Sequence, residues 1–344
     1  MKRLVKLGCL AGAFCLLFCA CASKPEAEVN RSDFVLGTVC SISITSGGTE
    51  KILDEAFARL REIENRMSAN KEGTEIAAIN EASGKKPVTV TPDTFYVISK
   101  ALEYAQKTNG AFDPTVEPLV KLWNIGSEDA KVPPLSKIKS ALALIDYKKV
   151  QMDPDKLTVY LPVPGMRLDL GAIAKGYAAD EIEKIMVANK VKSAIIDLGG
   201  NVFVYGKKKD GTPWRVGIQN PYSDRGEYIG LVTGGQMTVV TSGVYERYFI
   251  ENGKRYHHIL DTKTGFPVDN GLISVSIVTE SSIDADALST SVFALGLDKG
   301  MKLVESLKDV YAIFIDSNNK VYLSPGTNKI FTLTDNKFSL SDYK

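Results

Sequence analysis

The sequence is poor in the residues that most often build metal centres and covalent cross-links. It contains only two histidines, the adjacent pair His257 and His258, among 344 residues. A zinc site built from many histidines is therefore excluded. Of its five cysteines, only Cys40 lies beyond position 21. Cys40 falls in the alternating strand pattern of residues 38–44, so we interpret it as a buried packing residue and not as a nucleophile.

Several familiar nucleotide-binding and catalytic motifs are absent as well. The chain has no Gly-x-x-x-x-Gly-Lys-Ser/Thr loop, and residues 171–176 resemble one only superficially because Lys175 precedes the second glycine. It has no Gly-x-Ser-x-Gly elbow. The formal net charge is +1 and no long basic run is interleaved with aromatic residues, so the sequence gives no support for nucleic-acid binding.

The first 20 residues have the composition of an export signal. Three basic residues among the first six are followed by the apolar stretch 7–19, which is too short for a typical membrane span. Ala20 and Cys21 resemble the end of a bacterial lipoprotein signal, with Cys21 as the lipidated first residue of the mature chain. An ordinary cleaved signal and an uncleaved anchor are the alternatives. If Cys21 is lipidated, Cys40 has no partner for a disulfide, and the core alone must stabilise the domain.

The remaining chain divides into a tether and one domain. Residues 21–32 are polar and have no periodicity, as expected of a tether. Residues 33–344 contain no linker, which predicts a single domain. Helices and antiparallel-looking hairpins alternate in clusters and not as regular βαβ units, so we expect an α+β fold with mixed, mostly antiparallel sheets and packed helices. A similar layout of strand, long helix and hairpin strands in the two halves is compatible with an internal duplication.

Three stretches of the domain carry clear local patterns. Residues 50–67 predict an amphipathic helix. A short strand from Met166 is expected to pass through Gly171 into a helix that runs to about Ala188. Residues 248–251 and 257–260 predict a hairpin.

The segment from Ser281 to Gly296 predicts a helix with one chemically distinct face. Ser281 and Asp284 form a plausible capping pair, and Gly296 is a natural stop. Asp286 and Thr290 lie four residues apart, so a carboxylate and a hydroxyl lie one turn apart on the same face. Two hard oxygen ligands at that spacing suit Mg²⁺. The alternative is that the aspartates only favour the helix N-terminus.

Several motifs occur together in one order along the chain. The longest are Arg167-Leu-Asp-Leu-Gly-Ala-Ile-Ala-Lys-Gly-Tyr-Ala-Ala-Asp180, Asp197-Leu-Gly-Gly-Asn201, His258-Ile-Leu-Asp-Thr-Lys-Thr-Gly265 and Ala285-Asp-Ala-Leu-Ser-Thr290. They are preceded by Gly37-Thr38, Met67-Ser68 and Ala111-Phe112-Asp113. From about residue 33 to residue 330, this combination closely resembles the ApbE family, the FAD:protein FMN transferases.

The resemblance implies an activity and a set of ligands. Members of the family split the pyrophosphate of FAD and transfer FMN to a threonine hydroxyl of an acceptor protein, which releases AMP. By the resemblance, Asp286, Thr290 and the backbone carbonyl of Ala172 would hold Mg²⁺, which would neutralise charge on the leaving phosphate. The residues expected to contact the flavin nucleotide are Asn70, Ala111, Phe112, Asp113, Asp169, Lys175, His258 and Ile259.

His258 is the candidate general base, because the unperturbed pKa of histidine lies near neutrality. It would take the proton from the acceptor threonine or from water. The alternative is a histidine that packs between strands. His257 is expected to point to the opposite face of the strand and to be structural or solvated.

Two positions depart from the family pattern. Asn70 stands where many members carry an aromatic residue, typically tyrosine, that packs on the bound flavin nucleotide, and Leu36 stands where methionine is frequent. Loss of one stacking ring would cost on the order of 1 kcal/mol of binding, or roughly fivefold in affinity. We therefore hypothesise that the protein holds FAD less tightly and also hydrolyses it to FMN and AMP at the same site, as an FAD pyrophosphatase.

The signal and the family together predict where the protein acts. A lipid anchor at Cys21 would hold the domain on the periplasmic or extracytoplasmic face of the cytoplasmic membrane. The acceptors implied by the family are subunits of Rnf- or Nqr-like redox complexes. Two alternatives from other classes stay open. One is a flavin-binding lipoprotein that delivers cofactor without catalysis, and the other is a structural lipoprotein.

Overall fold

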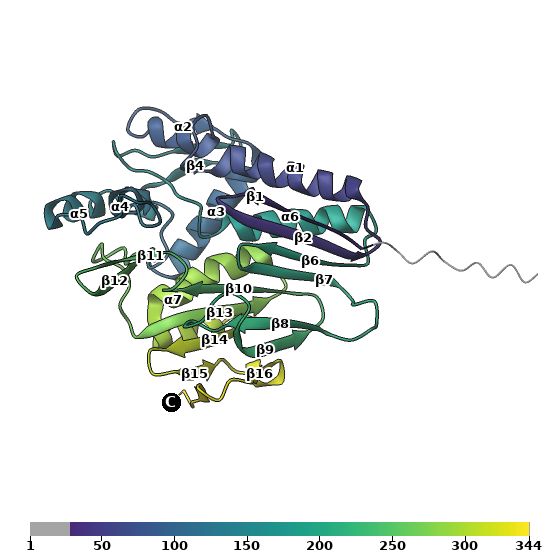
Figure 1. Cartoon of the computed structure of the whole chain (residues 1–344). Coiled ribbons are helices and arrows are strands. Elements are labelled where there is room, and N and C mark those ends of the chain that lie inside the picture. The colour runs from purple at the N-terminus through teal and green to yellow at the C-terminus, as the bar shows by residue number, and fades with distance from the viewer. Residues whose placement is uncertain (1–27, 344) are drawn as a thin grey trace, which may run out of the picture.

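A nine-stranded sheet forms the centre of the molecule (Figure 1). The computed structural model describes residues 28–343, so the predicted signal peptide and Cys21 lie outside the described residues. All neighbouring strands of the sheet are antiparallel except the last pair, which is parallel. In spatial order the strands are β1 (Val29–Val35), β2 (Thr38–Ser46), β6 (Ser193–Leu198), β7 (Asn201–Gly206), β10 (Met237–Gly243), β13 (Leu272–Thr279), β14 (Tyr311–Asp316), β15 (Lys320–Leu323) and β17 (Ser339–Leu340).

The main hydrophobic core lies between one face of this sheet and a layer of helices. Alternation along β2 turns Cys40, Ile42 and Ile44 inward, and all three are fully buried. Cys40 is thus a packing residue, as predicted, and burial raises the pKa of its thiol to about 12. The helices that contribute to this core are α1 (Glu50–Met67), α2 (Glu75–Glu81), α3 (Pro92–Lys107), α6 (Ala174–Ala188) and α7 (Ser282–Glu305).

A second core fills the space between the opposite face of the central sheet and a three-stranded sheet. Along β10, Val239 faces this second core and Val240 faces the helices, so the strand is buried on both sides. Burial on both faces explains the unbroken apolar run Ala312–Ile315 in β14. The strands of the three-stranded sheet are β8 (Trp214–Gln219), β9 (Tyr228–Gly234) and β16 (Phe331–Leu333).

A third, smaller core carries a hairpin on the side of the molecule drawn at the left of Figure 1. Trp123 is 1% exposed and packs against the stacked rings of Phe249 and Tyr256, whose centroids lie 6.4 and 5.6 Å from its own. Its Nε1 donates a hydrogen bond to the carbonyl of Gly265 at 2.8 Å. The elements around it are α4 (Glu117–Trp123), α5 (Leu135–Leu142), β11 (Tyr248–Glu251) and β12 (Lys254–His257). A further small sheet contains β3 (Val88–Thr89), β4 (Gln151–Asp153) and β5 (Thr158–Tyr160).

The predicted fold class of mixed, mostly antiparallel sheets with packed helices is confirmed, and the predicted helix over 50–67 coincides with α1. The internal duplication stays a hypothesis. The second strand of the predicted hairpin was placed wrongly, because β12 ends at His257 and does not begin there. Asn252 and Gly253 adopt φ values of 50° and 75°, which close a two-residue turn and fix the pairing of Glu251 with Lys254.

Two further local predictions were wrong. No strand forms between Met166 and Gly171, because the backbone donors there bind elsewhere: Leu168 donates to Oδ1 of Asn80 and Asp169 donates to the carbonyl of Pro114. Gly296 interrupts the helical backbone with φ 79° and ψ 178°, yet helix resumes after it, so α7 is kinked there and not ended. None of the helices in residues 28–343 has the length and apolar character needed to cross a bilayer.

Candidate active site

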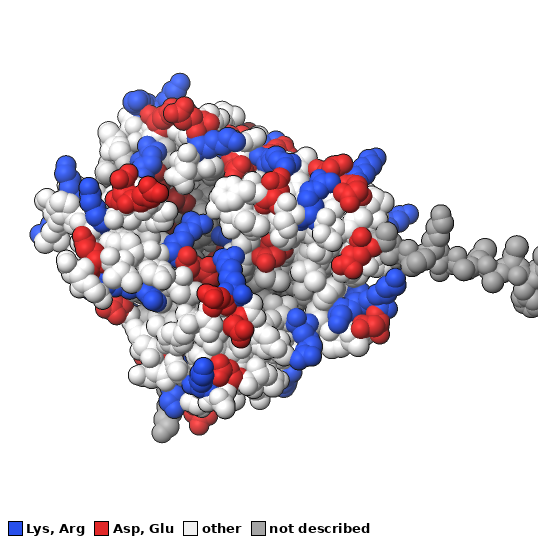
Figure 2. Space-filling model, viewed as in Figure 1, with Lys and Arg blue, Asp and Glu red and all other residues white. Residues whose placement is uncertain are grey.

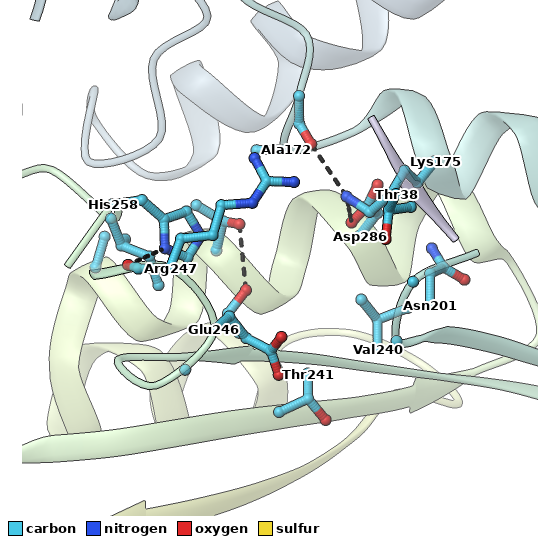
Figure 3. A pocket seen from close by; sticks show the side chains of 18 of the residues that line it. Thr38, Ala172, Lys175, Asn201, Val240, Thr241, Glu246, Arg247, His258 and Asp286 are labelled. Atoms are coloured by element: carbon cyan, nitrogen blue, oxygen red, sulfur yellow. Dashed lines mark hydrogen bonds and ion pairs between the residues drawn. The ribbon is translucent and has the colours of Figure 1, made fainter. Parts of the chain in front are cut away.

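One cavity of about 500 Å³ brings the predicted site residues together (Figure 3). This volume falls within the roughly 300–1,000 Å³ of typical small-molecule sites. The predicted residues that line it are Ala111, Phe112, Asp113, Asp169, Ala172, Lys175, His258, Ile259, Asp286 and Thr290. Asn70 is different, because it is exposed beyond the end of α1 and is not among the lining residues.

A close crossing of α6 and α7 holds the carboxylate of Asp286 at the cavity wall. Asp286 is 3% exposed, and its Oδ2 accepts a hydrogen bond from the backbone N–H of Gly176 at 2.9 Å. Nζ of Lys175 lies 3.8 Å from Oδ1 of Asp286 and donates to the carbonyl of Gly171 at 3.2 Å. The absence of a side chain at Gly176 allows this approach, since a Cβ there would lie 2.2 Å from the carbonyl oxygen of Ser282.

The start of α7 is fixed by two aspartates with structural roles. Asp180 on α6 accepts hydrogen bonds from the backbone N–H groups of Ser282 and Ile283 at 2.8 and 2.9 Å. Burial raises the pKa of Asp180 to about 6. Asp284 forms the predicted capping pair with Ser281, and it also binds Lys100 at 2.8 Å. Asp284 therefore stabilises the helix start, as predicted.

The predicted Mg²⁺ ligands have a donor set that suits a hard cation. Asp286 presents Oδ1 without a backbone donor, and Oγ1 of Thr290 lies 3.3 Å from Oγ of Ser242, which leaves the hydroxyl a free lone pair. Ala172 lines the same cavity. Within residues 28–343, no group of three or more His, Cys, Asp and Glu side chains could hold a metal ion. The predicted set contains one carboxylate only, so its role stays a prediction.

Two loops bring the remaining predicted nucleotide contacts to the cavity. The carboxylate of Asp113 accepts hydrogen bonds from the N–H and the hydroxyl of Thr115 and from the N–H of Tyr147, so it is used to hold its own loop. Asp169 accepts from the N–H of Gly171 at 2.6 Å. Burial raises the pKa of Asp169, and the charges of Lys175 and Arg247 oppose that shift.

The two histidines have different environments, although His258 lies just beyond the end of β12. His257 is 5% exposed, and its Nε2 lies 2.8 Å from the carbonyl oxygen of Val268, which marks it as structural. His258 lines the cavity, and its Nδ1 lies 3.3 Å from the carbonyl oxygen of Arg247. Burial lowers the pKa of His258 to about 4, and the charge of Arg247 adds to this. The ring is therefore neutral at pH 7.

Charged residues that the sequence had not singled out also line the cavity. They include Arg225, Glu246 and Arg247, and Arg225 pairs with Glu246 at 3.1 Å. Figure 2 shows basic and acidic side chains interspersed on this face, including around the hollow near its centre. These residues lie just before the hairpin or in the β8–β9 loop, where no recognised motif marks them. Their proximity to His258 depends on the strand order.

The chain is similar to proteins of one family over most of its length. The model of the ApbE family matches residues 36–314. The FAD:protein FMN transferase of Treponema pallidum (strain Nichols) is 38% identical over 330 residues, which cover 91% of each chain. That of Haemophilus influenzae is 31% identical over 346 residues, which cover 97% of this chain and 99% of the other.

Solved structures agree with this similarity. The ApbE protein of Thermotoga maritima has a TM-score of 0.82 and 32% identity, and the match covers 88% of this chain and 99% of that one. The flavin transferase ApbE from Vibrio cholerae has a TM-score of 0.79 and 26% identity, with the same coverage of 88% and 99%.

Proposed function

The chain belongs to the ApbE family, and from this premise we propose that it transfers FMN from FAD to a threonine hydroxyl of an acceptor protein and releases AMP. The observation that carries the proposal is that Lys175, Asp286, Thr290 and His258 line one cavity. A cation, hard oxygen ligands and a neutral imidazole thus surround a space of the size that a nucleotide needs.

The proposed reaction exchanges one phosphorus–oxygen bond for another. Oγ of the threonine forms a bond to the phosphorus of the FMN half, and the bond from that phosphorus to the bridging oxygen breaks. AMP leaves with the bonding electron pair on its phosphate oxygen. The threonine proton passes to Nε2 of His258, which is free to accept it when Nδ1 donates to the carbonyl of Arg247.

Three oxygen donors on this chain would hold Mg²⁺. They are Oδ1 of Asp286, Oγ1 of Thr290 and the carbonyl of Ala172. When bound, the ion supplies positive charge that stabilises the leaving phosphate. Lys175 would add a positive charge on the same side of the site, because its Nζ lies beside Asp286. The N–H of Gly176 keeps Asp286 oriented toward the cavity by binding its other oxygen.

Water in place of threonine would give FMN and AMP, so hydrolysis is the proposed second activity of the same site. The support for it is the family resemblance, in which an aromatic ring usually stands at the position of Asn70 and holds the nucleotide; Asn70 itself lies outside the cavity lining. We also propose that Cys21 anchors the protein to the cytoplasmic membrane on its extracytoplasmic face. The proposed acceptors are membrane redox complexes of the Rnf and Nqr kind.

The test is incubation of the full chain, purified in detergent, with FAD and Mg²⁺ in the presence and absence of an acceptor protein. We expect AMP release in both cases, and an acceptor mass increased by one FMN moiety. Absence of both the mass increase and AMP would overturn the proposal. AMP release that strictly requires the acceptor would overturn only the proposed hydrolase activity.

Asp286→Ala separates an enzyme from a protein that only binds flavin. If the protein is an enzyme, we expect the variant to lose AMP release. If the protein only binds flavin, the variant should release flavin to the same extent as the wild type. Asp284→Ala is the matched control on the same helix, because Asp284 does not line the cavity. It should lower the melting temperature through loss of the Lys100 and Ser281 contacts, and it should keep Mg²⁺-dependent activity.

A further inference from the structure

Arg247 is a cation of the cavity wall that has no carboxylate partner among residues 28–343. The other two lining cations are paired: Lys175 lies 3.8 Å from Asp286, and Arg225 lies 3.1 Å from Glu246. In the part of the chain that the structure describes, no ion pair involves Arg247. A guanidinium carries five N–H donors in a planar fork that fits the oxygens of a phosphoryl group. Its charge and donors are therefore available to a ligand.

The backbone fixes where this guanidinium can reach. Arg247 immediately precedes β11, and its carbonyl accepts a hydrogen bond from the backbone N–H of His258 at 3.1 Å. The two residues thus continue the β11–β12 ladder into the cavity as a pair. The hairpin itself is anchored by the rings of Phe249 and Tyr256 against Trp123. Arg247 and His258 consequently lie at the base of a hairpin that is packed against the third core.

The side chain of Arg247 extends into the cavity. In Figure 3 it runs from the His258 side toward Ala172, and the Lys175–Asp286 pair lies beyond it. The charge of Arg247 lowers the pKa of His258, and it also opposes the raised pKa of Asp169 next to the Ala172 turn. The guanidinium therefore lies between His258 and the turn that contains Asp169 and Ala172. The space for a ligand lies between it and Lys175.

We propose that Arg247 forms an anion subsite that binds the nonbridging oxygens of the phosphoryl group under attack. The inference rests on the proposed function and assigns the two cations to different phosphates. Lys175, beside Asp286, would serve the leaving AMP phosphate. Arg247, beside His258, would serve the phosphoryl group that the threonine oxygen attacks. Negative charge on these nonbridging oxygens must be held in place while the new bond forms.

Arg247→Gln is the principal variant, assayed as the full chain in detergent with FAD, Mg²⁺ and an acceptor protein. We expect kcat to fall by about 10²–10³-fold, the loss typical for removal of one transition-state donor. Arg247→Lys retains the charge without the fork and should recover part of the rate. Arg255→Gln is the matched control, because Arg255 lies on the same hairpin but stacks on Tyr248 outside the cavity. Its kcat should equal that of the wild type.

The pH profile and direct binding give readouts that a purely structural role would not move. Loss of the Arg247 charge should raise the pKa of His258, so the acid limb of kcat/KM should shift to higher pH in Arg247→Gln. Binding of ADP, measured by calorimetry in Mg²⁺ buffer, should weaken in Arg247→Gln and stay unchanged in Arg255→Gln. If Arg247→Gln does not fold, as judged by its melting curve, Arg247→Lys carries the kcat and ADP-binding measurements, because it lacks the planar fork but keeps the charge that acts on His258.

The outcomes separate the inference from the proposed function. Wild-type protein that neither transfers FMN nor releases AMP overturns the proposed function, while loss of ADP binding in Arg247→Gln would still support the anion subsite. Active wild-type protein, with kcat, acid limb and ADP binding all retained in a folded Arg247 variant, overturns the subsite alone.

Discussion

Replacing Gly176 by alanine perturbs the crossing of α6 and α7 that holds Asp286 at the cavity. A Cβ there would lie 2.2 Å from the carbonyl oxygen of Ser282, 2.7 Å from Cα of Ile283 and 2.7 Å from Cβ of Asp286. None of these atoms is the far end of a flexible side chain. An ordinary carbon–oxygen contact is about 3.3 Å long, so the helices would have to separate by about 1 Å.

Two opposing effects decide the sign of the change in the free energy of unfolding. Alanine stabilises a helix interior by about 1 kcal/mol relative to glycine. Overpacking of a well-packed core costs typically about 1–3 kcal/mol. Because the contacts involve backbone, we expect overpacking to dominate and the protein to be destabilised by about 1–2 kcal/mol. At about 2–4 °C per kcal/mol, the melting temperature should fall by several degrees.

Differential scanning calorimetry and the Mg²⁺ dependence of AMP release measure the two consequences. Separation of the helices would move the N–H of Gly176 from Oδ2 of Asp286, so half-saturation of the activity should require more Mg²⁺. Gly235→Ala is the control, because no heavy atom lies within 4 Å of its Cβ position and its φ is ordinary. A melting temperature of Gly176→Ala at or above that of the wild type would refute the reasoning.

Three further predictions address other parts of the site. His258→Asn should lower kcat by about 10²–10⁴-fold, and the acid limb of the wild-type kcat/KM should lie near pH 4, because desolvation and the charge of Arg247 lower the pKa of the half-buried imidazole to about 4; a limb near pH 6.5 would contradict the assigned environment. Asn70→Tyr should slow FAD hydrolysis and leave FAD bound on purification, as read from the absorbance of the purified protein; equal flavin content in both proteins would count against stacking at this position. The pKa of Asp180 is raised to about 6 in the folded protein, so its contribution to stability is present at low pH and lost as the pH rises through about 6. The difference in melting temperature between wild type and Asp180→Asn should therefore change between pH 4 and pH 7, and a constant difference would refute the burial argument.

Local sequence patterns determined those features that depend on neighbouring residues alone. The apolar spacing of residues 50–67 predicted α1 to the residue, and Ser281 and Asp284 predicted the cap of α7. Adjacent residues of an extended chain face opposite ways, which separated the structural His257 from the cavity-lining His258 although the hairpin bounds were wrong. These outcomes follow from backbone geometry over a few residues.

Only the tertiary structure decided which distant residues meet. In the sequence, nothing distinguishes Gly176 from other glycines, and only the structure shows that α7 crosses α6 at this residue. Likewise, only the structure shows that Asp180 caps a helix that begins more than 100 positions later. No sequence motif marked Arg247, because its place beside His258 is set by the register of the hairpin. Contacts between distant segments are set by strand order and helix packing, and no local periodicity records them.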